Sequence, residues 1–167
     1  MRNGYLWLLC AGAAAAPAVA MAQTYQPGNG ALQMWGPEGI AASPLWVQYW
    51  LYVMMATFVI GLLFAIIRQR LEAIVLSAGV LLSIFGGRFL ADQMGWAYLS
   101  GYVALAHLIC WSPALYLLLS RRTFLKERSL YAVWAGAATA VVLFSFVFDI
   151  RDAAIYLDHI LGLGVLV

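Results

Sequence analysis

Three charged residues lie next to long apolar stretches of this sequence and are the first candidates for chemistry: Arg88, Asp92 and Asp149. Charged side chains at membrane depth are costly and commonly mark ion, proton or ligand sites. Counted from the nearest loops at about 1.5 Å per helical residue, Arg88 and Asp149 reach the same level, and Asp92 follows Arg88 by one helical turn. The spacing predicts that Arg88 pairs with Asp149. Two interpretations stay open: an ion pair that anchors a helix bundle, or a site for an ion, a proton or an anionic ligand.

His107 and Trp111 are the second candidates, because residues four apart share one face of a helix. Pro113 follows them and predicts a kink, since proline cannot donate a helical hydrogen bond. These features could form a binding pocket or supply a haem or metal ligand. Alternatively, His107 forms a hydrogen bond to another helix, for which Ser83 and Thr139 are candidates.

The numbers of histidines and cysteines do not favour a haem or metal centre. A haem held by two histidines needs a second histidine at similar depth, and the other one, His159, follows a polar segment. One isolated histidine and one isolated cysteine make a poor metal site. The sequence therefore predicts no metal and no cofactor.

A polar segment, residues 149–152 (DIRD), precedes the end of the chain. Arg151 and Asp152 lie in it, and Tyr156 and His159 follow at spacings of three or four. This segment is either a polar extension of the last helix or an amphipathic helix on the outer leaflet. Asp152, Tyr156 and His159 could form an acid–base cluster, but no nucleophile, glycine-rich loop or set of metal ligands accompanies them. The residues predict no catalytic site and favour a protein that is not an enzyme.

The composition identifies the solvent that surrounds these residues. Of the 167 residues 65% are apolar and only 10% are charged, too few charges to cover a water-facing surface. The lipid bilayer is therefore the expected partner. A formal net charge of +2 without a basic stripe excludes a nucleic-acid-binding protein.

Four apolar segments are each near the roughly 20 residues that cross a bilayer: about 46–67, 71–91, 98–120 and 131–148. Their short connections predict an all-α fold, a four-helix up-down-up-down transmembrane bundle. Residues 1–22 are typical of a cleavable signal peptide, with a retained first helix as the alternative. We accordingly divide the chain into the signal peptide (1–22), a periplasmic Gly/Pro-rich arm predicted to be a loop (23–44), the bundle (45–150) and an amphipathic C-terminal tail on the periplasmic side (151–167).

The distribution of charge predicts the orientation. One set of loops and helix ends carries Arg68, Arg70, Arg121, Arg122, Lys126 and Arg128 with Glu72 and Glu127. The opposite set carries Arg88 and Arg151 with Glu38, Asp92, Asp149, Asp152 and Asp158. Because cytoplasmic loops are enriched in Lys and Arg, we expect a bacterial inner-membrane protein with both termini in the periplasm.

Small residues recur every four positions in two of the segments. The second segment offers Gly79, Ser83, Gly87 and Ala91, and the fourth offers Ala132, Gly136 and Ala140. Stripes of this kind allow the backbones of two membrane helices to approach closely. We expect the second and fourth helices to pack together, and a contact with another copy or another subunit through one stripe is the alternative.

Three strings carry a resemblance: PLWVQYWL, GYVALAHLICWSPALYLLLSRR and FSFVFDIRDAAIYL. With them the chain, from about Pro44 to Leu157, resembles an uncharacterised group of small four-span proteobacterial inner-membrane proteins with no assigned activity. The resemblance implies the four-span architecture and no catalytic function. It also implies that the string from His107 to Pro113 and residues 149–152 belong to the group's pattern.

Two classes of function fit these observations. The first is a non-enzymatic accessory or scaffold subunit that docks on a larger membrane complex through its small-residue stripes and aromatic faces. The alternative is a binder or transporter of a small molecule, lipid or ion. It would use the cluster of Arg88, Asp92 and Asp149 at the periplasmic face, with His107 beneath it.

Overall fold

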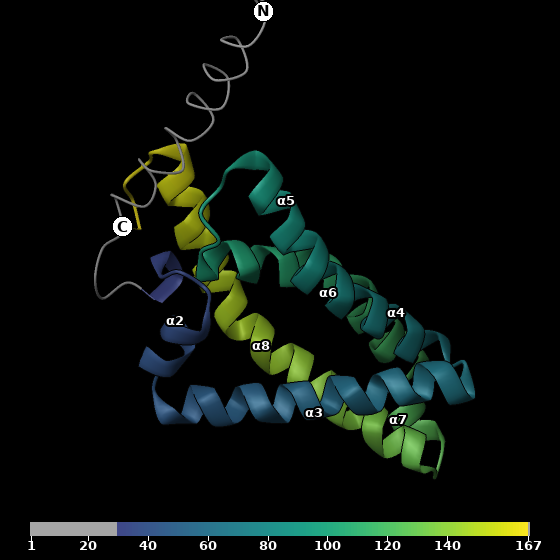
Figure 1. Ribbon diagram of the computed structural model, residues 1–167. Helices are drawn as coiled ribbons and strands as arrows, with labels where there is room; N and C mark the ends of the chain where they lie inside the picture. Colours follow the sequence, from purple (N-terminus) through teal and green to yellow (C-terminus); the bar gives the residue numbers. More distant parts are fainter. Residues whose placement is uncertain (1–29, 167) are drawn as a thin grey trace, which may run out of the picture.

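Helices account for most of the chain from residue 30 to residue 166, the part that the computed structural model describes. In chain order they are η1 (Gly30–Leu32), α2 (Pro37–Ala42), α3 (Leu45–Arg68), α4 (Leu71–Leu81), the π-helical turn η2 (Leu82–Gly86), α5 (Gly87–Met94), α6 (Ser100–Arg121), α7 (Thr123–Lys126) and α8 (Leu130–Leu161) (Figure 1). The predicted signal peptide lies outside the described residues.

Four helical stretches within residues 30–166 are long and apolar enough to cross a membrane: Leu45–Arg68, Leu71–Met94, Ser100–Lys126 and Leu130–Leu161. The shortest have 24 residues, which at about 1.5 Å per residue exceed the roughly 30 Å of a hydrocarbon core. The all-α fold and the four predicted apolar helices are confirmed. These helices fit a multi-pass membrane protein.

Each long helix packs against two others. Helix α3 contacts α4 and α8, and α6 contacts the same two helices, with its most extensive contact on α8. We call the end of this assembly that carries η1 and α2 the α2 end, and the opposite end the α7 end (Figure 1).

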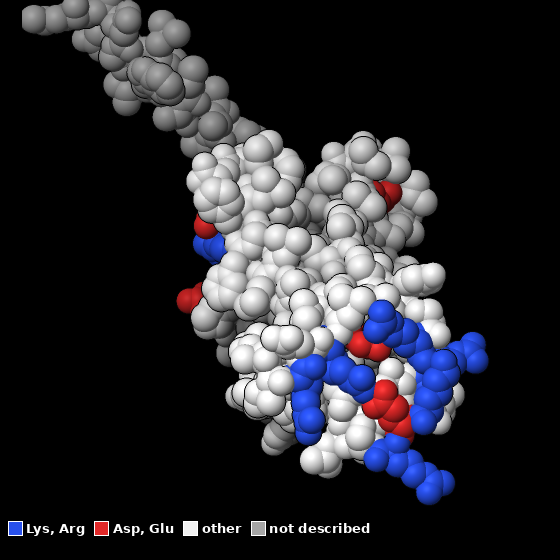
Figure 2. Space-filling view, turned by 90° about the vertical axis from the view of Figure 1, so that its right-hand side faces the viewer, with Lys and Arg blue, Asp and Glu red and all other residues white. Residues whose placement is uncertain are grey.

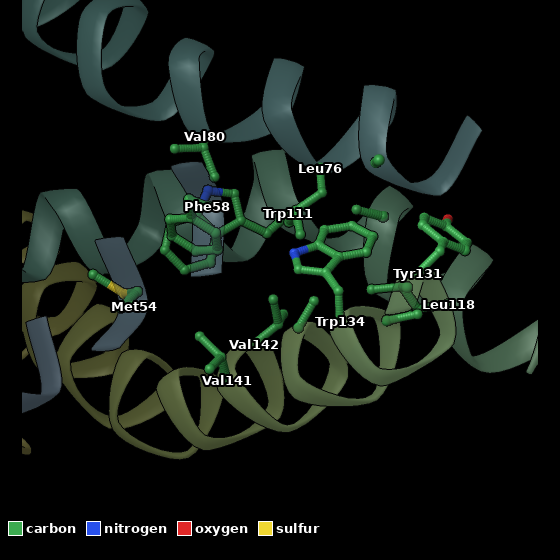
Figure 3. Packing of buried hydrophobic residues seen from close by; sticks show 14 residues of the cluster. Met54, Phe58, Leu76, Val80, Trp111, Leu118, Tyr131, Trp134, Val141 and Val142 are labelled. Carbon is green, nitrogen blue, oxygen red and sulfur yellow. The ribbon is translucent and has the colours of Figure 1, made fainter. Parts of the chain in front are cut away.

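Large aromatic side chains fill the main core, where α3, α4, α6 and α8 meet (Figure 3). The ring of Phe58 meets the ring of Trp111 edge-on, with 5.0 Å between centroids. Trp134 lies against Gly61, where an added Cβ would come within 2.7 Å of the indole ring. The indole N–H of Trp134 also donates a hydrogen bond of 2.9 Å to the backbone carbonyl of Thr57. These contacts tie α6 and α8 to α3.

The small residues of the second span face α6, and the predicted packing of that stripe on the fourth helix is wrong. A Cβ added at Gly79 would collide with the backbone carbonyl oxygen of Cys110 in α6. Ser83 accepts a hydrogen bond from the indole of Trp111, also in α6. Gly87 lies nearest to side chains of α6 as well, and Gly136 in α8 lies against Phe124. The spacing of small residues identifies the face of a helix that packs closely, but it does not identify which helix packs against that face. Ala140, the other packing candidate, is exposed.

A second hydrophobic cluster lies at the α2 end. Leu32 of η1 and Leu99 of the loop between α5 and α6 pack there with Tyr102 and Tyr156. At Gly101 an added Cβ would lie 2.6 Å from the carbonyl oxygen of Asp152, so the close approach of α6 and α8 requires glycine.

Part of the arm before α3 is helical, so a loop throughout residues 23–44 is the wrong prediction. Residues 37–42 form α2, which has Pro37 in its first turn followed by Glu38. Proline at the first helical position and an acidic residue in the first turn both favour helix initiation. The prediction missed this signal because the segment is short and rich in glycine.

Helix α8 continues without a break through residues 151–161. The polar segment is therefore an extension of the fourth long helix, the first of the two interpretations of the sequence. Its 32 residues span about 48 Å, more than a bilayer core requires. Asp158 is buried and accepts hydrogen bonds from the backbone N–H groups of Val165 and Leu166 at 3.1 and 3.0 Å. This carboxyl group holds the chain after Leu161 against the helix end.

Candidate functional site

The α2 end contains a cavity of about 410 Å³ between α2, α3, α6 and α8, which we call the α2-end cavity. Its aromatic wall comes from Trp35, Trp46, Trp50 and Phe148. Its polar wall comes from Gln33, Ser43, Ser100, His107, Asp149, Arg151 and Asp152. Residues from the arm, from three long helices and from the extension of α8 therefore meet at one site.

His107 and Asp149 are a buried pair in the wall of this cavity. His107 Nδ1 lies 3.4 Å from Asp149 Oδ2, and both atoms are shielded without a hydrogen bond to any other group of the described chain. The imidazole stacks on the indole of Trp111, with ring centroids 3.9 Å apart. His107 and Trp111 thus share one face of α6, as their spacing predicts. Buried polar groups without a hydrogen bond are uncommon and call for an explanation.

The predicted pairing of Arg88 with Asp149 is wrong. Arg88 Nε instead lies 3.1 Å from Asp92 Oδ2, and both side chains are 56% exposed. The guanidinium of Arg88 also lies over the ring of Tyr98, 5.2 Å from its centroid, and burial raises the pKa of the Tyr98 phenol. The sequence places Arg88 and Asp149 at the same level but does not give the direction in which either side chain points.

Arg151 and Asp152 form a second pair at the edge of the cavity. Arg151 Nη1 lies 3.3 Å from Asp152 Oδ1, and the side chain of Arg151 is 69% exposed. Tyr156, which follows Asp152 by one turn, packs instead in the cluster with Tyr102. The wall thus combines a buried pair, His107 with Asp149, and a more exposed pair, Arg151 with Asp152.

Next to His107, a polar contact joins α6 to the second span. Trp111, on which His107 stacks, donates its indole N–H to Ser83 Oγ at 3.1 Å, and Ser83 lies within the π-helical turn η2. Single π-helical turns are frequent at functional sites. Ser83 is thus a positioning residue for Trp111 and, through Trp111, for His107. The predicted hydrogen bond from His107 to Ser83 or Thr139 is not formed, since the partner of His107 is Asp149.

A polar network that the sequence did not predict lies at the α7 end. Glu72 is only 3% exposed and accepts hydrogen bonds from Thr123 at 3.2 Å and from Tyr131 at 3.1 Å. Arg121 Nη1 lies 3.6 Å from the same carboxylate. The signal in the sequence is an acidic residue inside the first turn of an apolar helix. The network ties α4 to α6, α7 and α8.

Around this network the surface is strongly basic (Figure 2). Arg70 pairs with Glu127 and also lies over the ring of Tyr131, 4.5 Å from its centroid. The hydrogen bond to Glu127 raises the pKa of the Arg70 guanidinium. A second cavity of about 490 Å³ lies beside this pair. Arg68, Arg70 and Glu127 are the charged residues among those that line it.

Within residues 30–166, no group of three or more His, Cys, Asp or Glu side chains is placed to hold a metal ion. Comparison with known protein families, with curated protein sequences and with solved structures gave no match. The interpretation of the α2-end cavity therefore rests on its own chemistry.

Proposed function

We propose that this chain is a multi-pass membrane protein that binds a small molecule in the α2-end cavity. The observation that supports this most directly is a cavity of about 410 Å³ whose wall combines four aromatic residues with the pair of His107 and Asp149. Small-molecule sites typically occupy about 300–1,000 Å³, are largely apolar, and contain a few converging polar groups. The proposal keeps the binder interpretation of the sequence. It places the binding site at the pair of His107 and Asp149 and not at the cluster that includes Arg88 and Asp92.

The packing of small residues favours a binder over an accessory subunit. The scaffold interpretation relied on these stripes, together with aromatic faces, as docking surfaces for a larger complex. Gly79 and Ser83 are instead buried against α6 of the same chain. Since these positions are occupied within the molecule, we assign the remaining exposed apolar faces to contact with lipid.

The charge of the two ends supports an orientation for this site. Basic residues gather at the α7 end (Figure 2), and cytoplasmic ends of membrane proteins are enriched in Lys and Arg. We therefore place the α7 end in the cytoplasm, with an up-down-up-down bundle in a bacterial inner membrane and both termini in the periplasm. The resemblance to small four-span inner-membrane proteins agrees with this placement. The α2-end cavity then opens toward the periplasm.

Native mass spectrometry of the full chain, gently purified from membranes, tests binding. Ala104 lines the cavity, so Ala104→Phe should fill part of it, whereas Ile109→Phe adds similar bulk on the exposed side of the same helix. We expect the wild type and Ile109→Phe to carry a bound small molecule that Ala104→Phe lacks. If all three proteins carried the same bound mass, or if none carried one, the proposal would be contradicted.

A further inference from the structure

The charged groups on the wall of the α2-end cavity do not balance. Among the described residues that line it, Asp149 and Asp152 contribute two carboxyl groups, and Arg151 contributes the one permanently positive group. Arg151 is largely exposed and already lies against Asp152. Asp149 is only 15% exposed, and its partner is the imidazole of His107, a much weaker cation than arginine. The deeper part of the cavity is therefore acidic.

Aromatic rings line the same cavity. Trp35, Trp46, Trp50 and Phe148 contribute to its wall, and the rings of Trp46 and Phe148 are in contact, with centroids 5.7 Å apart. The faces of aromatic rings attract cations, most strongly for tryptophan, and quaternary ammonium groups are commonly recognised by aromatic cages. Aromatic walls next to carboxyl groups thus favour a positively charged ligand.

The buried pair adds a third argument. Asp149 Oδ2 and His107 Nδ1 are 3.4 Å apart, yet neither has a hydrogen bond within the described chain. A positively charged ligand beside Asp149 would add a permanent positive charge, which the imidazole of His107 does not supply. An anion would be repelled by Asp149 and Asp152. Arg88, the cation expected from the sequence to hold an anionic ligand, pairs elsewhere with Asp92.

From the acidic wall, the aromatic rings and the unsatisfied pair together, we infer that the α2-end cavity binds an organic cation of the alkylammonium class. The positive head group lies among Trp46, Trp50 and Asp149, and the alkyl part lies along the apolar wall formed by Val47, Leu51 and Met54. This inference rests on the proposed function and adds the chemical class of the ligand. The same chemistry describes a free amine and the ammonium head group of a lipid.

Three probes with the same six-carbon tail separate charge from apolar contact: hexyltrimethylammonium, 1-hexanol and hexanoate. The measurement is saturable binding of each radiolabelled probe to the full chain in lipid nanodiscs, with empty nanodiscs subtracted. We expect hexyltrimethylammonium to bind about tenfold more tightly than hexanol, with no saturable binding of hexanoate. Competition by short-chain phosphatidylethanolamine would assign the site to a lipid head group, and competition by free ethylamine alone would assign it to a soluble amine.

Variants distinguish a charge effect from a loss of structure. Asp149→Asn should reduce the preference for hexyltrimethylammonium over hexanol about tenfold, and Trp50→Leu about two- to fivefold. Arg151→Gln should act in the opposite direction and tighten binding of the cation. Asp92→Asn is the matched control, because it removes a carboxylate at the same end of the molecule but outside the cavity, and it should leave the preference unchanged. A misfolded variant would lose both probes together, whereas the preference between them reports charge.

Negative results can distinguish an error in the ligand class from an error in the binding site itself. Saturable binding of hexanol or hexanoate that equals or exceeds binding of the cation would overturn the cation class while the cavity remains a binding site. An Asp149→Asn variant that keeps the full preference for the cation would overturn the cation class in the same way. Absence of saturable binding for all three probes would overturn the inference, and the native mass spectra of Ala104→Phe would then decide the proposed function on their own.

Discussion

His107 Nδ1 and Asp149 Oδ2 lie 3.4 Å apart and connect α6 to α8 within the helices that form the α2-end cavity. Both side chains are largely shielded from solvent, with exposed fractions of 11% and 15%. Removing one member of a buried pair leaves the other without a counter-charge, so each single change costs more than the pair itself contributes.

We therefore predict that His107 and Asp149 are energetically coupled. His107→Ala and Asp149→Ala should each destabilise the fold, and the double variant should lose less than the sum, with a coupling energy of about 0.5–3 kcal/mol. Unfolding in mixed detergent micelles, followed by circular dichroism, measures the four free energies. The matched cycle of Arg88→Ala with Asp149→Ala should be additive, since Arg88 pairs with Asp92. Coupling between Arg88 and Asp149 in that second cycle would support the pairing expected from the sequence.

Gly79 should be the glycine of the second span that tolerates a side chain least. A Cβ there would collide with the carbonyl oxygen of Cys110, which is backbone and cannot rotate away. Gly79→Ala should therefore lower the free energy of unfolding by about 1–3 kcal/mol, the usual cost of overpacking.

Gly87→Ala is the control, because it lies in the same stripe but its nearest neighbour is the Cβ of Ala106, 3.8 Å away. Alanine is a better helix former than glycine, so this variant should be neutral or slightly stabilising. Chemical unfolding of the two variants compares them. Equal effects at Gly79 and Gly87 would mean that the second span does not pack on α6 through Gly79.

Glu72 should contribute more to stability than the more exposed Glu127 of the same end. Glu72→Ala leaves the hydroxyls of Thr123 and Tyr131 without their acceptor, and each buried unsatisfied group costs about 1–3 kcal/mol. Glu127→Ala removes a largely exposed partner of Arg70 and should cost at most about 1 kcal/mol. Thermal unfolding of the two variants compares them directly. A larger loss for Glu127→Ala would contradict the assignment of Glu72 as the centre of the network.

The sequence is sufficient to predict the four long helices but not the contacts between them, and the reason is physical. Apolar length and scarcity of charge are local properties, so the four spans could be predicted from composition. The partner of Gly79 depends on which helices become neighbours, and no local pattern specifies that. The sequence indicates Asp149 as a charge next to an apolar span, but the rotation of α8 about its axis decides that it meets His107 and not Arg88. Glu72 was missed because Thr123 and Tyr131 become its partners only in the folded chain.

The proposed orientation predicts opposite labelling of two exposed positions at the two ends. In a background with Cys10→Ala and Cys110→Ala, Gln93→Cys lies at the α2 end and Lys126→Cys at the α7 end, and both positions are exposed. Because the basic α7 end is expected in the cytoplasm, a membrane-impermeant maleimide should label position 93 in intact cells and label position 126 only after lysis. Labelling is measured as a mass shift on gels. Labelling of position 126 in intact cells, with position 93 protected, would reverse the orientation and place the α2-end cavity on the cytoplasmic side. Its organic cation would then have to be a cytoplasmic one.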